Sequence, residues 1–346
     1  MKNNLTVDIE PTNRCNASCH FCPRDATPHQ GLMTQEVFTQ ALQRAIEFRD
    51  ATGAEVKVSL CGLGEPLINP KTPNFIRQVR EAGLGCVMSS NAAMLDERRA
   101  RAILDAGIQQ ININVGDEGE QYEEVYKLPF EKTRDNVVRF AEMAGDQCEV
   151  NIVLVDYRQD RDHVKHMVRY WQGLGLKKFL FFDIMNRGGT LFIDHMQYET
   201  MPELAQAKAL LEATGKPAFC GIPFISVFVG YDGNYYLCCS DWTKETSMGT
   251  VFDESFLSVT VPKFQQVTSR EPVCKSCNWD PVNRVTESLR AIAAGEETEA
   301  DLQQLIDKMT GTSQILVDCI EDYGIEVADL PRPEVAPKRR IPVTAF

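Results

Sequence analysis

The sequence predicts an α/β protein, a partial (β/α)6 barrel that is followed by a small C-terminal module with a β-hairpin and a helix. Strand-like apolar runs alternate with helix-period runs six times between residues 5 and 214. Glycines stand where these helices should end, at Gly83, Gly107, Gly145 and Gly173. After residue 218 the pattern changes to two short strand-like runs around the turn pair Asp232-Gly233, which indicates a hairpin.

The repeating units are assigned in chain order. We expect strands at 5–10, 55–60, 85–90, 111–115, 149–155 and 177–184. We expect helices at 34–50, 71–83, 96–107, 130–145, 160–175 and 199–214. Repeats of this kind form a parallel sheet with right-handed crossovers, and the active site of such a barrel lies at the carboxyl ends of its strands.

Three segments divide the chain. Residues 1–217 form the predicted barrel, and residues 218–283 form the predicted hairpin module. Residues 284–346 comprise a helical stretch to about residue 324 and a tail with four prolines and four basic residues, which we expect to be an extended arm.

The overall charge excludes several classes of partner. The chain has 346 residues and a formal net charge of −13, so it lacks the basic surface that binds nucleic acid or anionic membranes. No apolar run approaches the roughly 20 residues of a membrane span, and the first ten residues contain no signal-like apolar stretch. We therefore expect a cytoplasmic protein that binds neither membrane nor nucleic acid, and its twelve cysteines are interpreted as metal or redox groups rather than disulfides.

Three cysteines follow the first predicted strand with the spacing C-x3-C-x2-C, at Cys15, Cys19 and Cys22. An iron–sulfur cluster normally takes four cysteine ligands, so a loop with three leaves one iron free to bind another molecule. A structural zinc ion is the alternative, and it would need a further ligand such as His29.

A second group of cysteines lies late in the chain. It comprises Cys220, Cys238, Cys239, Cys274 and Cys277. The remaining cysteines, Cys61, Cys86, Cys148 and Cys319, are isolated and are interpreted as buried thiols.

The first cysteine loop, with Phe21 before its third cysteine, resembles the signature loop of the radical S-adenosylmethionine (radical SAM) superfamily. The resemblance implies a 4Fe–4S cluster on Cys15, Cys19 and Cys22, with SAM on the open iron. Reductive cleavage of SAM then yields a 5′-deoxyadenosyl radical that abstracts hydrogen from the substrate. Phe21 is accordingly a candidate cofactor contact.

Further segments resemble the SAM-binding motifs of the same family. Gly64 and Glu65, after the second strand, resemble the motif that meets the amino group of SAM. Ser89, Ser90 and Asn91, after the third strand, are candidates for the ribose or carboxylate of SAM. Asn114 occupies the polar position after the fourth strand, where the family often has Ser or Asp.

The late cysteines resemble the SPASM and twitch extensions of radical SAM enzymes. The spacing Cys220-x12-Gly233-x4-Cys238 and the pair Cys274 and Cys277 imply one auxiliary 4Fe–4S cluster, as in the shorter twitch type. Cys239 is the alternative to Cys238, because neighbouring side chains in a strand point to opposite faces.

The reaction predicted from this resemblance is the oxidation of a carbinol. The twitch-type dehydrogenase of 2-deoxystreptamine biosynthesis has a similar layout of auxiliary cysteines. We therefore expect a radical SAM oxidoreductase that acts on a small polar metabolite, uses the auxiliary cluster as electron acceptor and takes electrons from a reducing partner such as flavodoxin or ferredoxin. Arg187, after the sixth strand, is the candidate catalytic residue.

Two other functions remain open at this point. The first is the crosslinking or epimerisation of a ribosomally made peptide, for which Cys61, Cys86 or Cys148 offers a thiol as hydrogen donor. The second, of another class, is a zinc-binding scaffold protein. It would need eight ligands for two zinc ions, and the chain offers three plus four in suitable places.

Overall fold

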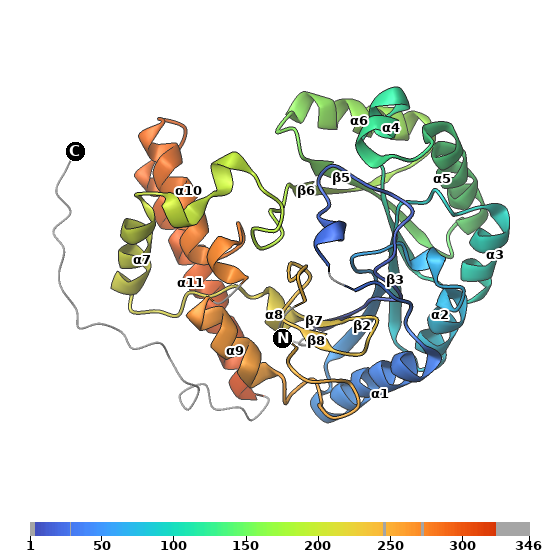
Figure 1. Ribbon diagram of the computed structural model, residues 1–346, viewed down its shortest axis with the longest axis horizontal. Coiled ribbons are helices and arrows are strands. Elements are labelled where there is room, and N and C mark those ends of the chain that lie inside the picture. Colours follow the sequence, from blue (N-terminus) through green and yellow to red (C-terminus); the bar gives the residue numbers. More distant parts are fainter. Residues whose placement is uncertain (1–3, 28, 245–246, 271–272, 323–346) are drawn as a thin grey trace.

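The computed structural model describes residues 4–27, 29–244, 247–270 and 273–322 (Figure 1). The extended arm predicted for the tail lies outside these residues. A curved sheet forms one side of the molecule, with a layer of helices on its outer face, and a separate group of helices lies on the other side.

Eight strands form a single sheet in the order β6-β5-β4-β3-β2-β1-β7-β8. All neighbours are parallel except the β7–β8 hairpin. The strands are β1 (Asn4–Ile9), β2 (Glu55–Leu60), β3 (Gly85–Ser90), β4 (Gln110–Asn114), β5 (Glu149–Asp156), β6 (Lys178–Asp183), β7 (Ser226–Val229) and β8 (Tyr235–Tyr236). The predicted fold class, a partial (β/α)6 barrel with a C-terminal hairpin, is confirmed.

The hairpin extends the sheet of the barrel instead of standing apart from it. β7 pairs in parallel with β1, with Thr6 opposite Ser226 and Asp8 opposite Phe228. Without this pairing β1 would be an edge strand with a row of unsatisfied backbone groups. The segment that begins at residue 218 is therefore joined to the barrel by backbone hydrogen bonds.

The helices of the barrel are α1 (Gln35–Thr52), α2 (Thr72–Glu81), α3 (Glu97–Asp105), α4 (Gly119–Tyr126), α5 (Phe130–Ala144) and α6 (Arg161–Gly173), and all except α4 lie near their predicted positions. The helix expected at 199–214 is a correction, because it begins at Leu204 and packs with the C-terminal helices instead of the barrel. Thr34, Asp96 and Asp160 accept hydrogen bonds from the first turns of α1, α3 and α6. Gly173 is a correction, because it is the last residue of α6 and Gly175 adopts the positive φ of +89°. The sequence did not predict α4.

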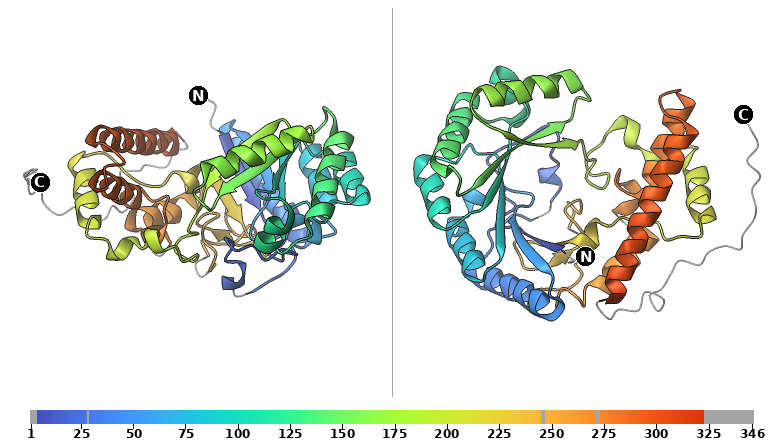
Figure 2. Two further views of the ribbon diagram at one scale, coloured as in Figure 1. Left: turned by 90° about the horizontal axis from the view of Figure 1, so that it is seen from above. Right: turned by 180° about the vertical axis from the view of Figure 1, so that it is seen from behind.

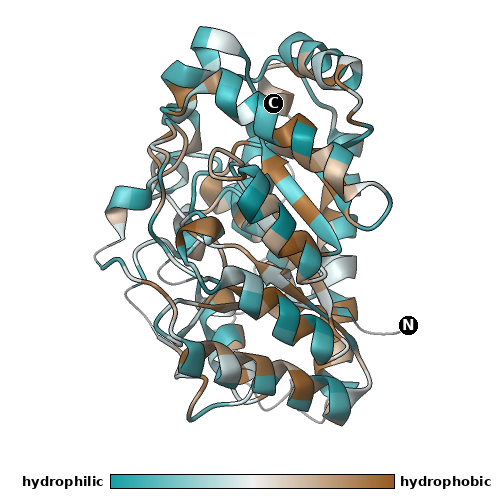
Figure 3. Cartoon of the chain, turned by 90° about the vertical axis from the view of Figure 1, so that its right-hand side faces the viewer, coloured by the Kyte–Doolittle hydropathy of each residue, from teal (hydrophilic) through white to brown (hydrophobic). Residues whose placement is uncertain are grey.

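The two faces of the sheet differ in polarity. Leu5, Val7 and Ile9 of β1 are buried against the outer helices, whose exposed surfaces are mainly hydrophilic (Figure 3). The alternate residues of the strands face the concave side and are largely polar. They include Thr6, Asp8, Ser59, Ser89, Asn112, Asn114 and Asn151. The concave face of the barrel therefore suits a polar molecule.

A second, smaller core lies among the C-terminal helices (Figure 2). The helices of this part are α7 (Leu204–Ala213), α8 (Ile222–Ile225), α9 (Thr260–Ser269), α10 (Pro281–Ala293) and α11 (Glu299–Asp322). Ala207 and Leu211 of α7 pack there with Val285 of α10 and with Leu302 and Ile306 of α11. Of the helices that the structure describes, none is both long and apolar enough to cross a membrane.

The variant Phe140→Ala tests the assignment of the main core, to which Phe140 of α5 belongs. Its side chain is 0% exposed, whereas Phe192 is 70% exposed. We expect Phe140→Ala to lower the free energy of unfolding by about 3–5 kcal/mol, because it removes a buried ring and leaves a cavity. Phe192→Ala, the matched control, should change it by less than about 0.5 kcal/mol. Urea unfolding measures both variants, and equal effects would contradict the assignment of the core.

Candidate active site

The first three cysteines lie together in the loop after β1. Cys15, Cys19 and Cys22 are each partly exposed. Burial, and then the neighbouring Cys22 and Cys15, raise the pKa of Cys19 to about 12. The thiols are therefore protonated in the metal-free chain, and binding of iron by the thiolates would release protons.

Neighbouring residues fix the shape of this loop. Arg24 Nη1 donates to the carbonyl oxygens of Cys15 at 3.0 Å and Ala17 at 2.6 Å. The amides of Ser18 and His20 donate to backbone carbonyls of Tyr126 and Val125 in α4. The cysteines are thus held by α4, a helix that the sequence had not revealed.

Phe21 anchors the loop through its ring. It stacks on Tyr157 with a centroid distance of 5.2 Å and meets Tyr126 edge-on at 5.5 Å. These contacts pack Phe21, which belongs to the cysteine loop, against α4 and the residue that follows β5, and so support the loop. A cofactor contact by Phe21 remains a prediction.

Gly64 and Glu65 lie directly against the cysteine loop. A Cβ atom on Gly64 would lie 2.4 Å from the carbonyl oxygens of Thr12 and Arg14, so only glycine fits. Glu65 N donates to Arg14 O at 2.9 Å. Burial raises the pKa of Glu65, and hydrogen bonds from Asn91 N, Leu67 N and Ser90 Oγ oppose this shift. Glu65 is thereby a positioned acceptor beside Cys15.

The residues predicted at the carboxyl ends of β3 and β4 lie nearby. Asn91 Nδ2 donates to Asn16 Oδ1 at 2.9 Å and approaches Cys15 Sγ at 3.7 Å. Ser90 is buried and binds Glu65. Ser89 and Asn114 are partly exposed on the concave face of adjacent strands. Their roles toward SAM remain predictions.

The second group of cysteines also gathers in space. Burial, and then the neighbouring Cys239, Cys277 and Cys220, raise the pKa of Cys238. Burial, and then Asp280, Cys277 and Cys220, raise the pKa of Cys274. Cys239 lies beside the same group but also interacts with Asp8 and Arg187. The choice of Cys238 rather than Cys239 as the ligand stays a prediction, because both cysteines lie beside Cys220 and Cys277.

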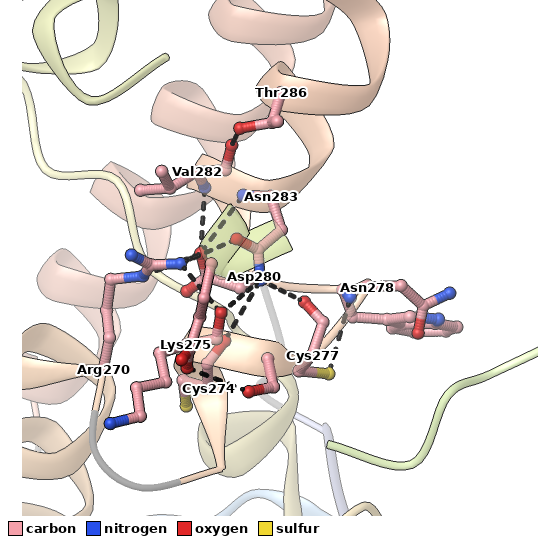
Figure 4. Close-up of polar contacts among 12 residues, drawn as sticks. Arg270, Cys274, Lys275, Cys277, Asn278, Asp280, Val282, Asn283 and Thr286 are labelled. Atoms are coloured by element: carbon pink, nitrogen blue, oxygen red, sulfur yellow. Dashed lines mark hydrogen bonds and ion pairs between the residues drawn. The ribbon is translucent and has the colours of Figure 1, made fainter. Parts of the chain in front are cut away.

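The loop between Cys274 and Cys277 is wrapped around one amide side chain (Figure 4). Asn283 Nδ2 donates to the carbonyl oxygens of Cys274, Lys275 and Cys277 at 3.4, 2.9 and 2.8 Å. Asp280 caps α10 and pairs with Arg270 at 2.8 Å. The first turn of α10 therefore fixes the last two cysteines.

Arg187 lies between the two cysteine groups. Its charge acts on both Cys22 and Cys239, and its guanidinium carbon is 5.4 Å from the ring centroid of Trp242. Arg187 Nε and Trp242 Nε1 are buried and have no hydrogen-bond partner among the residues that the structure describes. Two buried donors at this place are suited to an oxygen atom of a bound molecule.

Sequence reasoning missed two charged contacts next to the site. The buried Asp117, three residues after β4, lies 2.9 Å from the partly exposed Arg158 and 3.0 Å from His163. Glu10, at the end of β1, pairs with Lys244, and both side chains are almost fully buried. A single Glu after a predicted strand does not indicate an ion pair, because its partner Lys244 is more than two hundred residues away in the sequence.

The residues present fit iron–sulfur clusters. The three thiols of the first loop lie beside a glycine that no other residue can replace, and the five thiols of the second group lie close enough to act on one another electrostatically. Among the described residues, no three His, Cys, Asp or Glu side chains are arranged to hold a single metal ion. In a cluster each thiolate binds a different iron, so this arrangement differs from that of a single-ion site.

The variant Asn283→Ala tests whether this amide supports the loop of the second cysteine group. Asn283→Ala removes three hydrogen bonds to the loop, so we expect a loss of about 1–3 kcal/mol in the free energy of unfolding. The amount of iron bound by the second group of cysteines should also decrease in this variant. Asn74→Ala, which removes an exposed contact with Gln35, is the control. Unchanged stability and iron content in Asn283→Ala would contradict the role of the amide.

The variant Lys244→Met tests whether the ion pair between Lys244 and Glu10 holds the loop that precedes Glu65. Glu10 Oε1 accepts from Leu63 N at 2.8 Å, and Lys244 holds the same carboxylate. We expect Lys244→Met to weaken SAM binding about tenfold, equivalent to about 1.4 kcal/mol, because the loop loses its anchor. Calorimetric titration of the reconstituted protein with SAM measures this. The exposed Lys208→Met is the control, and equal affinities in both variants would contradict the argument.

Family comparisons agree with this geometry. Residues 9–170 match the radical SAM superfamily, and residues 220–278 match the iron–sulfur cluster-binding SPASM domain. The AdoMet-dependent heme synthase of Oleidesulfovibrio alaskensis is 26% identical over 184 residues, which cover 52% of this chain and 45% of that protein. The chain thus matches only about half the length of its curated relatives.

Solved structures share the fold at low identity. SuiB of Streptococcus suis, bound to its precursor peptide SuiA, superposes with a TM-score of 0.60 and 12% identity, covering 83% of this chain and 74% of SuiB. BtrN in complex with AdoMet and 2-DOIA has a TM-score of 0.51 and 17% identity, covering 79% of this chain and 92% of BtrN. The radical SAM domain and the SPASM domain together imply SAM and 4Fe–4S clusters as the cofactors. The chain thus carries a radical SAM domain, followed by a C-terminal iron–sulfur cluster-binding domain of the SPASM type.

Proposed function

We propose that this radical SAM enzyme is an oxidoreductase that converts a carbinol of a small polar metabolite into a carbonyl group. The observation that carries the proposal is the position of Arg187 and Trp242. Their unpartnered N–H groups lie between the SAM-cluster loop and the auxiliary cysteines. An oxygen-bearing substrate held there would have one cluster on each side.

The concave face supports a polar substrate. Asn112 is hydrogen-bonded to Asn151 at 3.2 Å and to Gln110 at 3.0 Å, and hydroxyl groups of Ser59 and Ser226 lie near Asp8. Such donors and acceptors match a molecule with several hydroxyl groups. A sugar, a cyclitol or a nucleoside precursor has this chemistry.

The atoms and electrons of the reaction balance with the cofactors named. When bound, SAM and its cluster, reduced by an external donor, would supply the radical that takes one hydrogen atom from the carbinol carbon, and the auxiliary cluster would take up the electron that remains after the hydroxyl proton leaves. We propose a flavodoxin or ferredoxin as that donor and a cytoplasmic location. Arg187 orients the substrate oxygen through its guanidinium group.

Asp8 is the proposed proton acceptor. It lies on the concave face of β1, accepts from Cys61 Sγ at 3.3 Å and is hydrogen-bonded to Ser226. Burial raises the pKa of Asp8, which brings a carboxylate closer to the range where it can take up a proton.

The second candidate is a redox-neutral modification, such as epimerisation within a ribosomally made peptide. Cys61 favours it, because this thiol lies at the carboxyl end of β2 beside Asp8 and Cys239. Cys86, in the first half of β3, and Cys148, just before β5, lie toward the opposite end of the sheet. Cys61 is thus the candidate hydrogen donor among the three thiols considered. The zinc-scaffold alternative has no support from the families that match.

Product analysis with Arg187→Leu tests the proposal. A screen of polyhydroxylated metabolites with the reconstituted enzyme should give a product lighter by two hydrogens, with one SAM consumed per product. Arg187→Leu should lower kcat about 100-fold, the usual cost of one lost donor at a reacting oxygen. The exposed Arg161→Leu should behave as wild type. A product of unchanged composition that carries deuterium from heavy water would favour the second candidate instead.

A further inference from the structure

Lys263 is a buried cation next to the auxiliary cysteines. It lies in α9, and its side chain belongs to a residue that is only 2% exposed. Its Nζ donates to the carbonyl oxygens of Pro223 at 2.9 Å and Ser226 at 3.4 Å. Within the described parts of the chain, no carboxylate lies at ion-pair distance from this ammonium group. A buried charge that is held only by carbonyl dipoles is costly, unless another charge nearby offsets it.

The hairpin brings Cys238 to the end at which this lysine is bound. β7 and β8 pair up to Phe228 opposite Tyr236, and Ser226 and Cys238 each lie two residues beyond this pair, at the same end of the hairpin. Ser226 is the residue whose carbonyl oxygen binds Lys263. Pro223, the other acceptor, follows Cys220 by three residues. Lys263 therefore contacts the backbone beside two of the four proposed ligands.

The electrostatics agree with this placement. Burial lowers the pKa of Lys263 to about 8, and the negative charges of Cys238 and Asp8 oppose the shift. The lysine is therefore predominantly protonated at pH 7. A 4Fe–4S cluster held by four thiolates carries net negative charge, and this charge grows when the cluster is reduced. A nearby cation stabilises the reduced form more than the oxidised form.

We propose that Lys263 is the counter-charge of the auxiliary cluster and raises its reduction potential. Its benefit to catalysis rests on the proposed function, in which this cluster accepts an electron. A higher potential would make the cluster a better acceptor for the electron left by the substrate. The lysine contacts no substrate and acts only through its charge.

A purely structural role is the competing explanation. Lys263 also binds two carbonyl oxygens at the end of the short helix α8, as an ordinary capping side chain does. That role needs a hydrogen-bond donor at this position but no charge. The two explanations therefore differ in what happens when the charge is removed and a donor is retained.

The experiment measures the midpoint potential of the auxiliary cluster alone. The full chain carries the changes Cys15→Ala, Cys19→Ala and Cys22→Ala, so that only the auxiliary cluster is reconstituted. The reduction of this cluster is then followed by electron paramagnetic resonance during a redox titration. The titration compares the chain that keeps Lys263 with its variants Lys263→Arg, Lys263→Gln and Lys263→Met. Lys208→Met, an exposed lysine of α7, is the control. Iron and sulfide are counted in each sample.

The proposal predicts that Lys263→Gln and Lys263→Met shift the midpoint potential to more negative values. Lys263→Arg and the control should keep the original value. Unshifted potentials in the uncharged variants, with full iron content, would overturn the proposal. Loss of the cluster in both uncharged variants would also overturn it, because Lys263 would then be a structural support. No substrate is used, so the result is independent of whether the oxidation itself is found.

Discussion

The parallel pairing of β7 with β1 determines how the two halves of the chain meet. Cys15, Cys19 and Cys22 follow the carboxyl end of β1. Cys220 precedes β7, and β8 returns the chain so that Cys238 lies near the start of β7. The two cysteine groups therefore lie toward opposite ends of one strand pair. Asp8 lies between them on the concave face of β1, and Arg187 reaches both groups from the loop after β6.

Buried charge reinforces this arrangement. Glu10 at the end of β1 supports the loop that leads to Glu65, and Lys244 of the second module holds Glu10 among the rings of Phe228, Tyr231 and Tyr236. A buried ion pair is costly to break, because one charge is left without a partner. The position of the loop that leads to Glu65 thus depends on the segment that contains the second group of cysteines.

Much of this could be predicted from local sequence patterns. The strands lie within one or two residues of their expected positions, since alternating burial and helix caps are local signals. The cysteine spacings indicated the right family. The pairing of β7 with β1, the support from α4, and the positions of Lys263 and Trp242 could not be predicted in this way. Each depends on contacts between residues that are far apart in the sequence, and none leaves a periodic or spaced pattern.

The measurement that tests the central claim most directly is iron and sulfide per chain after anaerobic reconstitution. It compares wild type with the variant that carries Cys15→Ala, Cys19→Ala and Cys22→Ala. The account predicts about eight irons in wild type and about four in the variant, because each cysteine group holds one four-iron cluster. Zinc in place of iron would contradict it. A wild type with about four irons, all lost in the variant, would contradict the auxiliary cluster and the electron acceptor that the proposed oxidation requires.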